Sequence, residues 1–408
     1  MSQLIDQIRA DFPILKRQIG GRPLIYFDNA ATSQKPRPVI EAITRYYRRH
    51  NANIHRGVHQ LADEATQLYE EARSQIAAFF GAQPEELIFV RNTTEAINLV
   101  AHHWAPLWLK KGDLILTSII EHHSNLLPWQ QLQERLGIRL ELIGLDQDYR
   151  LDYQQFLEKL NLKPKLVALN HVSNVLGTIN PIRAMVRAAH RAGALVLVDA
   201  AQSAPHLAID FSQLGADFLA FSGHKMLGPM GIGGLLVKKG LLEELPPLLV
   251  GGGMVAEVKA KKAKFLSELP TRFEAGTPNV AGAVGLAAAV NYLQKIGLKT
   301  IFKHEQKLNR LAHQLLAELP QIKLFPPRFS RYQTGIVSFT FAGIHSHDLA
   351  HLLSTNWGIA VRSGHHCAIP LHRYLQTATT TRASFYLYNT EAEVTQLAQA
   401  LKEISRLI

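Results

Sequence analysis

Short runs of apolar residues recur between residues 87 and 237 and alternate with stretches in which apolar positions return every three or four residues. Runs that are apolar throughout are typical of strands buried on both faces of a mostly parallel sheet, whereas the wider spacing is typical of helices. The predicted strands are Leu87–Val90, Leu114–Thr117, Arg139–Ile143, Leu166–Asn170, Leu195–Asp199, Phe218–Phe221 and Gly234–Val237. The predicted helices are Leu61–Phe80, Glu95–Trp108, Leu126–Leu136 and Ile182–Ala192. This alternation predicts a layered α/β domain with a mostly parallel seven-stranded sheet.

The pattern changes after about residue 285. The elements predicted there are Leu286–Ile296, Thr300–Leu319, Gly335–Phe341, His347–Leu353, Ile359–Arg362 and Glu391–Ile408. We therefore expect three parts: residues 1–50 beside the small domain, residues 51–285 as the large domain, and residues 286–408 as a smaller C-terminal α/β domain. Gly251–Ser267 is expected to be an irregular insert.

Composition narrows the class of protein. The chain has 408 residues, 47% of them hydrophobic, and a net charge of +11. Its Lys and Arg are scattered rather than striped, and the densest cluster, Lys259 to Lys264, is read as a solvated loop, so we do not expect nucleic-acid binding. An acidic protein partner or anionic small molecules fit the charge equally well. No apolar stretch reaches the roughly 20 residues of a membrane span, and we expect no signal peptide.

The chain contains a single cysteine, Cys367, within "RSGHHCAI". One cysteine excludes a disulfide within the chain and a cysteine-based zinc framework, and it fits the reducing cytoplasm. Cys367 is therefore a buried apolar residue, a metal ligand or a nucleophile, and too few ligands surround it for a metal site. The preceding His365 and His366 either tune its thiolate or shape its loop.

A lysine follows one predicted strand in "FSGHKMLGPMGIGG", residues 221–234. Ligands of such folds bind beyond the carboxyl ends of the strands, so Lys225 there either is a surface lysine or forms a Schiff base with an aldehyde cofactor. Asp199 ends a fully apolar strand, where a carboxylate is costly without a partner. The ring nitrogen of pyridoxal phosphate (PLP) would be such a partner, and Gln202 could donate to the ring hydroxyl. Capping a helix or binding a lysine is the alternative for Asp199.

Two further groups of polar residues follow strands. Thr93 and Thr94 open a predicted helix, whose free N–H groups suit a phosphate, although a plain N-cap gives the same pattern. His122 could stack on an aromatic cofactor and move protons, or it could be one of two surface histidines with His123. Adjacent histidines point apart, so this pair is not expected to chelate a metal.

Taken in order, these motifs resemble a known family. "YFDNAATSQKP", "IHRGVH", "NHVSNVLGT", "DAAQ", "SGHK", "FEAGTPN", "RSGHHCA" and "TRASFYLYNT" are similar to segments of class V aminotransferase-fold PLP enzymes, specifically the SUF-type (group II) cysteine desulfurases. The resemblance covers nearly the whole chain. It implies the PLP-dependent transferase fold type I, with a large domain and a smaller C-terminal domain that carries the cysteine loop.

The resemblance also implies site residues. Lys225, Cys367 and His122 are the implied catalytic residues: Lys225 holds PLP, His122 stacks on its ring and Cys367 is the nucleophile. The implied cofactor site comprises Thr93, Thr94, His122, Asn174, Asp199, Gln202, Ser222, His224, Lys225 and, from the other subunit of a homodimer, Thr277. The implied substrate site comprises Asn174 and Arg382, which hold a carboxylate, with Arg362, His55 and Arg56 at the entrance. No metal site is expected.

The implied reaction converts L-cysteine to L-alanine and leaves a persulfide on Cys367. A SufE-like or SufU-like acceptor would take this sulfur for iron–sulfur cluster assembly. His347 in "HSHD" either meets the zinc of a SufU-like acceptor or belongs to a helix-capping pair. Selenocysteine lyase or cysteine sulfinate desulfinase activity, an ordinary aminotransferase and a non-catalytic binding protein are the alternatives.

The chain departs from the family pattern in three places. Asn92 stands where many relatives have glycine, and since asparagine tolerates positive φ we expect the turn to survive. "LSTNWGIAV" holds one extra residue. The segment "YLQTATTTRAS" matches poorly until its last three residues, which puts the wall behind Cys367 in doubt.

Overall fold

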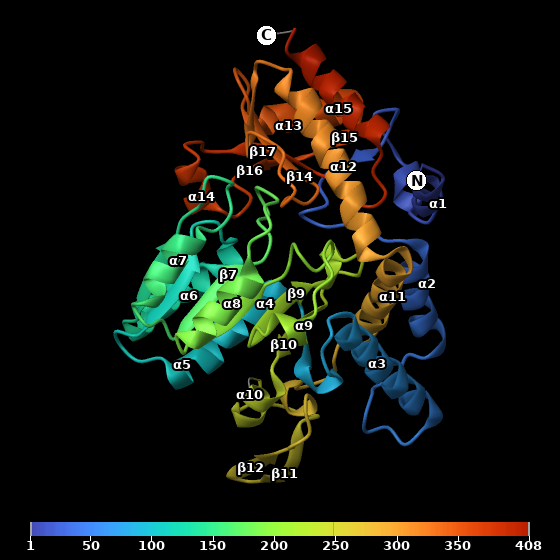
Figure 1. Ribbon diagram of the computed structural model, residues 1–408. Coiled ribbons are helices and arrows are strands. Elements are labelled where there is room, and N and C mark those ends of the chain that lie inside the picture. The colour runs from blue at the N-terminus through green and yellow to red at the C-terminus, as the bar shows by residue number, and fades with distance from the viewer. Residues whose placement is uncertain (1, 248, 407–408) are drawn as a thin grey trace.

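A seven-stranded sheet forms the centre of the protein in a computed structural model that describes residues 2–247 and 249–406 (Figure 1). The strand order is β4-β10-β9-β8-β7-β5-β6. The strands are β4 (Leu87–Val90), β5 (Leu114–Ser118), β6 (Arg139–Ile143), β7 (Leu166–Asn170), β8 (Leu195–Asp199), β9 (Phe218–Ser222) and β10 (Gly233–Val237). From β9 to β6 all neighbours are parallel, whereas β10 runs antiparallel to both β9 and β4. The predicted mostly parallel sheet is thus confirmed, with strand ends within one residue.

Both faces of this sheet are buried by helices. These helices are α3 (Gln60–Phe79), α4 (Thr93–Leu99), α5 (Ala105–Trp108), α6 (Leu127–Leu136), α7 (Tyr153–Leu160), α8 (Ile182–Arg191), α9 (Phe211–Leu214) and α10 (Lys239–Glu244). The helix predicted over Glu95–Trp108 is instead α4 and α5 joined by a π-helical segment, Val100–Trp104. That segment places the buried Trp104 against Phe218, with ring centroids 5.8 Å apart.

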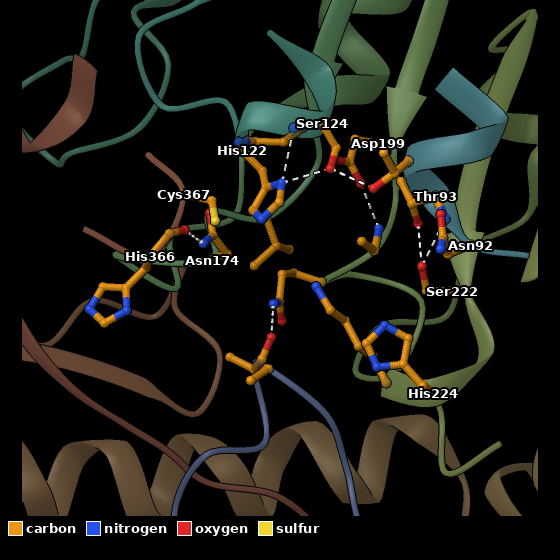
Figure 2. Close-up of a pocket in the computed structure, with 18 of the residues that line it drawn as sticks. Asn92, Thr93, His122, Ser124, Asn174, Asp199, Ser222, His224, His366 and Cys367 are labelled. Carbon is orange, nitrogen blue, oxygen red and sulfur yellow. Dashed lines mark hydrogen bonds between the residues drawn. The ribbon is translucent and has the colours of Figure 1, made fainter. Parts of the chain in front are cut away.

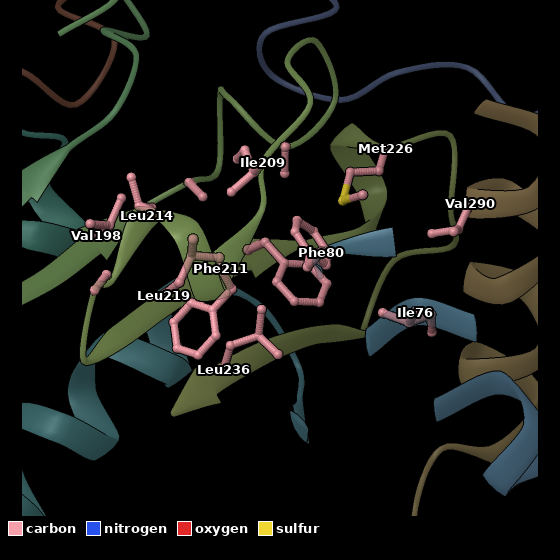
Figure 3. Packing of buried hydrophobic residues seen from close by; sticks show 14 of the residues in the cluster. Ile76, Phe80, Val198, Ile209, Phe211, Leu214, Leu219, Met226, Leu236 and Val290 are labelled. Atoms are coloured by element: carbon pink, nitrogen blue, oxygen red, sulfur yellow. The ribbon is translucent and has the colours of Figure 1, made fainter. Parts of the chain in front are cut away.

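The strand β9 shows why an apolar run without alternation marks a central strand. Leu219 and Phe221 join the hydrophobic cluster on one face, which also contains Phe80 and Leu236 (Figure 3). Phe218 and Ala220 join the cluster on the other face. Since both faces exclude water, every position of the strand is apolar until Ser222, where the strand leaves the core and the polar residues begin.

A second sheet lies in the C-terminal part of the chain, in the order β13-β14-β17-β16. Its strands are β13 (Ile322–Phe325), β14 (Ile336–Phe341), β16 (Arg362–Gly364) and β17 (Thr380–Ser384), all antiparallel to their neighbours. The helices of this region are α11 (Val280–Ile296), α12 (Leu298–Ala317), α13 (Ser346–Trp357), α14 (Ile369–Tyr374) and α15 (Glu391–Ile404). The predicted strand over Ile359–Arg362 is wrong as one element, because β15 (Ile359–Ala360) and β16 belong to different sheets. The predicted final helix ends at Ile404, and residues 407–408 lie outside the described range.

The N-terminal segment reaches across to this second sheet. It comprises α1 (Ser2–Ala10), β1 (Gln18–Ile19), β2 (Arg22–Pro23), β3 (Ile25–Tyr26) and α2 (Arg37–Arg49). β3 pairs in parallel with β15, and Asp28 forms a bridge with Ser384 of β17. α2 packs on α11 (Figure 1). The division into three parts at residues 50 and 285 stays a prediction.

The segment expected to be irregular, Gly251–Ser267, contains a hairpin. β11 (Val255–Lys259) pairs with β12 (Lys262–Phe265), and the hairpin projects from the body of the protein (Figure 1). The expected loop of Lys259 to Lys264 is therefore mostly strand, although its side chains are exposed as predicted. None of the helices in residues 2–247 and 249–406 has both the length and the apolar character to cross a membrane.

Candidate active site

A cavity of about 270 Å³ opens at the carboxyl ends of β7, β8 and β9 (Figure 2). The predicted site residues that line it are Thr93, Thr94, His122, Asn174, Asp199, Gln202, Ser222, His224, Lys225, Arg362, Cys367 and Arg382. Among the residues that the structure describes, Thr277, His55 and Arg56 do not line it. The fold thus brings a lysine, a carboxylate, two histidines, two arginines and a thiol together from segments far apart in the sequence.

Lys225 and Asp199 lie at the ends of adjacent strands. Asp199 is the last residue of β8, and Lys225 ends the short turn after β9. Burial lowers the pKa of Lys225 to about 8, although the nearby Asp199 opposes this effect. Burial raises the pKa of Asp199, while a 2.9 Å hydrogen bond from the amide of Ala201 favours its charged form. A buried carboxylate whose charge is stabilised by so few contacts is suited to bind a cationic group.

Hydroxyl groups gather at the start of α4. The amide of Thr93 donates to Ser222 Oγ at 2.9 Å, and the two hydroxyl oxygens lie 2.8 Å apart. The hydroxyl oxygens of Thr94 and Ser124 are 2.7 Å apart. Asn92 caps the helix through its side chain, with an extended φ of −175° that any residue adopts. The expected need for positive φ at Asn92 is therefore wrong, and glycine is not required there.

His122 enters the cavity as a neutral imidazole. Burial lowers its pKa to about 3, and the Lys225 charge acts in the same direction. Its Nδ1 accepts from the amide of Ser124 at 3.1 Å, which fixes the ring. The neighbouring His123 turns away to lie against His365, with ring centroids 5.6 Å apart. The two adjacent histidines thus point to different places, as predicted.

Arg382 is the most buried cation of the site, at 3% exposure. Its Nη1 donates to the backbone oxygen of Asn174 at 2.8 Å, and its Nη2 lies 3.3 Å from Asp28 Oδ1. Arg362 contacts the other oxygen of Asp28 at 3.5 Å. Within the described chain, Arg382 Nε and Asn174 Oδ1 are buried without a hydrogen-bond partner. A ligand carboxylate would satisfy the free N–H of Arg382.

Sequence reasoning did not assign Asp28. The residue stood inside "YFDNAATSQKP", but its position between two arginines depends on the bridge to Ser384, which no local pattern shows. Ser124 and His366 also line the cavity and were not assigned a role in cofactor or substrate binding.

Gln202 is held by its amide nitrogen. Nε2 donates to the backbone oxygen of Ala30 at 2.6 Å, and Oε1 is buried without a partner in the described structure. The predicted donation from Gln202 to a ring oxygen stays a prediction.

Cys367 is exposed and lines the cavity on a short turn. His366 and Cys367 both have positive φ, at 49° and 56°. Asn174 Nδ2 donates to the His366 oxygen and the His123 amide donates to the Cys367 oxygen, each at 2.7 Å. Figure 2 shows the ring of His366 directed away from the Cys367 sulfur. His366 therefore shapes the loop, while His365 Nδ1 accepts from the Cys367 amide at 3.1 Å.

Four predicted residues lie elsewhere. Thr277 Oγ1 donates to Asn53 Oδ1 at 3.2 Å. His55 and Arg56, which follow Asn53 closely in the sequence, are exposed. His347 is exposed at the start of α13, with Nδ1 2.6 Å from Ser363 Oγ. The roles of Thr277, His55 and Arg56 next to a second subunit stay predictions.

Comparison with known proteins identifies the family. The family model for class-V aminotransferases matches residues 25–397. The chain therefore belongs to this family. It is 48% identical over 398 residues to a probable cysteine desulfurase of Halalkalibacterium halodurans, covering 97% of each chain.

Solved structures support this family assignment. The apo structure of a cysteine desulfurase from Thermococcus onnurineus NA1 matches with a TM-score of 0.94 and 43% identity, covering 99% of this chain and 98% of that chain. A C-DES mutant with glycine covalently linked to the PLP cofactor matches with a TM-score of 0.82 and 26% identity, covering 96% and 98%. The predicted fold, enzyme class and cofactor are confirmed: a fold type I cysteine desulfurase that uses PLP.

The residues of the cavity fit this cofactor. The buried Asp199 lacks a full ionic partner and suits a pyridinium nitrogen. The hydroxyls of Thr93, Thr94 and Ser222 at the start of α4 suit a phosphate. Lys225 lines the same cavity, and its lowered pKa favours its nucleophilic form.

Proposed function

We propose that this chain removes sulfur from L-cysteine, releases L-alanine and carries the sulfur as a persulfide on Cys367. The observation that carries the proposal is that the sole cysteine of the chain lines the same cavity as Lys225, Asp199 and Arg382. An ordinary aminotransferase has no use for a thiol at that place. The single cysteine also fits action in the reducing cytoplasm.

PLP, when bound, supplies an electron sink for the bonds at the substrate Cα. Asp199 would hold the ring nitrogen protonated, because a buried carboxylate is stabilised by an adjacent cation. Thr93, Thr94, Ser222 and His224 would bind the phosphate. The neutral His122 would lie against the ring, where its low pKa avoids placing a second positive charge.

Arg382 and Asn174 would orient the substrate through its carboxylate. Arg382 is held in place by two contacts, and its buried Nε remains free of partners in the described residues. A guanidinium fixed in this way binds a carboxylate with little further loss of freedom. Arg362, at the more exposed side of Asp28, would line the entrance.

Lys225 would move protons at the substrate Cα. Its pKa of about 8 keeps a useful fraction uncharged near neutral pH, as a general base requires. Cys367, as a thiolate, would then attack the substrate sulfur. The S–S bond forms as the C–S bond breaks, and the electron pair of the broken bond stays with the substrate carbon, which gains a proton on the way to alanine.

The persulfide would pass to an acceptor protein of SufE-like or SufU-like type for iron–sulfur cluster assembly, as in the SUF-type subgroup. The exposure of Cys367 on a short turn supports this, because the acceptor must come to the sulfur. His347, exposed at the start of α13, is the candidate contact for the zinc of a SufU-like acceptor. We also propose a homodimer in which the partner chain contributes Thr277, with His55 and Arg56 at the entrance.

The test measures alanine release and the mass of Cys367 after incubation of the holoenzyme with L-cysteine. We expect alanine and a mass gain of one sulfur atom, and Cys367→Ser should abolish both while the PLP absorbance remains. Selenocysteine turnover that survives in Cys367→Ser while L-cysteine is not used by the wild type would favour selenocysteine lyase activity. No alanine from PLP-loaded wild type would overturn the proposal, and a colourless protein would favour a non-catalytic role.

A further inference from the structure

The segment that follows Cys367 departs from the family pattern, and two of its polar side chains are buried. Thr380, the first residue of β17, is fully buried, and His372 on α14 is 2% exposed. Both lie between Cys367 and Arg382 in the sequence. Neither lines the cavity, so neither belongs to the site described above.

These residues connect the two neighbours of Cys367. His366 Nε2 lies 2.9 Å from Thr380 Oγ1, which lies 3.2 Å from His372 Nε2. His372 Nδ1 lies 3.0 Å from the backbone oxygen of Ala368. The hydrogen bonds therefore run from residue 366 through Thr380 and His372 back to residue 368. We call this set, made of His366, Thr380, His372 and the Ala368 oxygen, the histidine clasp.

The proton positions in the histidine clasp follow from its last acceptor. A carbonyl oxygen can only accept, so His372 Nδ1 carries the proton and His372 Nε2 must accept from the Thr380 hydroxyl. Thr380 Oγ1 then accepts from His366 Nε2, which leaves His366 Nδ1 without a proton. His366 Nδ1 is indeed buried without a partner among the described residues. Burial keeps both rings neutral: it lowers the pKa of His366 to about 2 and also lowers that of His372.

The turn that the clasp encloses requires support. His366 and Cys367 are consecutive non-glycine residues with positive φ, a conformation that L-residues adopt at a cost and that persists only where neighbouring structure holds it. The carbonyls of His366 and Cys367 in this turn accept hydrogen bonds from Asn174 Nδ2 and from the His123 amide, respectively. The clasp adds contacts to the His366 side chain and to the Ala368 backbone oxygen, the two residues that flank Cys367.

We propose that Thr380 and His372 are positioning residues, which fix the His366–Cys367 turn so that the Cys367 sulfur faces the cavity. The proposal rests on the proposed desulfurase function. Thr380 and His372 act through the His366 side chain and the Ala368 backbone oxygen, and they do not line the cavity that would hold substrate and cofactor. Loss of the Thr380 hydroxyl would leave both imidazoles buried with an unmatched nitrogen.

The matched variants lie at adjacent positions of one strand. Thr380→Val removes the central hydroxyl at constant shape, whereas Thr380→Ser keeps it. Thr381→Val is the control, because Thr381 is 1% exposed and its hydroxyl has no partner within the described chain. Hydrogen exchange of the peptide around residues 363–372 is measured by mass spectrometry on each holoenzyme, together with kcat and KM for alanine release from L-cysteine.

We expect exchange in this peptide to be about tenfold faster in Thr380→Val, with kcat about tenfold lower and KM within about twofold of the wild type. Thr380→Ser should restore both quantities, and Thr381→Val should resemble the wild type. Equal exchange in Thr380→Val and Thr381→Val, or faster exchange with unchanged kcat, would overturn the positioning role.

Two controls separate the possible failures. If the wild type releases no alanine, the proposed function fails, and the exchange comparison alone still decides whether the clasp holds the turn. If Thr380→Val does not fold, His372→Asn replaces it, since the shorter amide can reach the Ala368 oxygen but not Thr380. Faster exchange in His372→Asn supports the clasp, and wild-type exchange contradicts it.

Discussion

The lowered pKa of Lys225 predicts the pH dependence of PLP uptake by the apoenzyme. Burial lowers this pKa from 10.5 to about 8. At pH 7 about one molecule in eleven then carries the uncharged amine, against about one in three thousand for an ordinary lysine. Because only the uncharged amine attacks the PLP aldehyde, burial raises the reactive fraction about three-hundredfold.

The assay follows the absorbance of the enzyme-bound cofactor after PLP is mixed with apoenzyme between pH 6.5 and 9.5. We expect the rate constant to rise about tenfold per pH unit at first and to level off near pH 8. Asp199→Asn should move the midpoint to lower pH, because the Asp199 charge raises the pKa of Lys225. Lys225→Ala is the control, since burial lowers the pKa of Lys35 to about 7 and this amine could also react. A rate that still climbs tenfold per unit above pH 9 would refute the reasoning.

Removing one partner of the buried Arg73–Glu274 ion pair, whose atoms lie 2.8 Å apart, should be strongly destabilising. We expect Glu274→Leu to lower the free energy of unfolding, measured in urea, by about 3–5 kcal/mol. The double variant that also carries Arg73→Met should lose less stability, because it leaves no unpaired buried charge. Equal losses in the single and the double variant would contradict this expectation. In Gly234→Ala the new methyl would lie 2.4 Å from the Phe221 ring, so thermal unfolding should show a loss of about 1–3 kcal/mol, and an unchanged transition would argue against this contact. Arg382→Lys should raise KM for L-cysteine about tenfold with an unchanged PLP spectrum, and a similar rise for cysteamine, which lacks the carboxylate, would count against the clamp.

The central sheet was predictable because its strands carry a strong local signal. A run such as Leu195–Asp199 is apolar on both faces, and its single carboxylate marks both the strand end and the cavity. The direction of β10 was not predictable, since an apolar run reads the same in either orientation. β17 was missed altogether: "TTRAS" is fully polar apart from one alanine, yet every residue is buried.

The residues of the site likewise divide into those that the sequence indicated and those that it did not. Asp199 ends a strand, and Lys225 and His122 come shortly after strands, so position and chemistry together indicated them. Asp28 and the histidine clasp depend on pairings between distant segments, of which a single sequence shows nothing. Thr380 reaches His366 because β17 aligns with β16, where Gly364 faces Thr380.

The contact between Asp28 and Arg382 has a consequence for synthesis on the ribosome. The two residues are 354 positions apart, which corresponds to about 20–70 s of elongation at roughly 5–20 residues per second. The seven strands that present Lys225 and Asp199 are all translated by residue 237, well before Arg382 emerges. A nascent chain can therefore complete its central sheet while the clamp for the substrate carboxylate is still missing, and the capacity to take sulfur from an amino acid arises only at the end of translation.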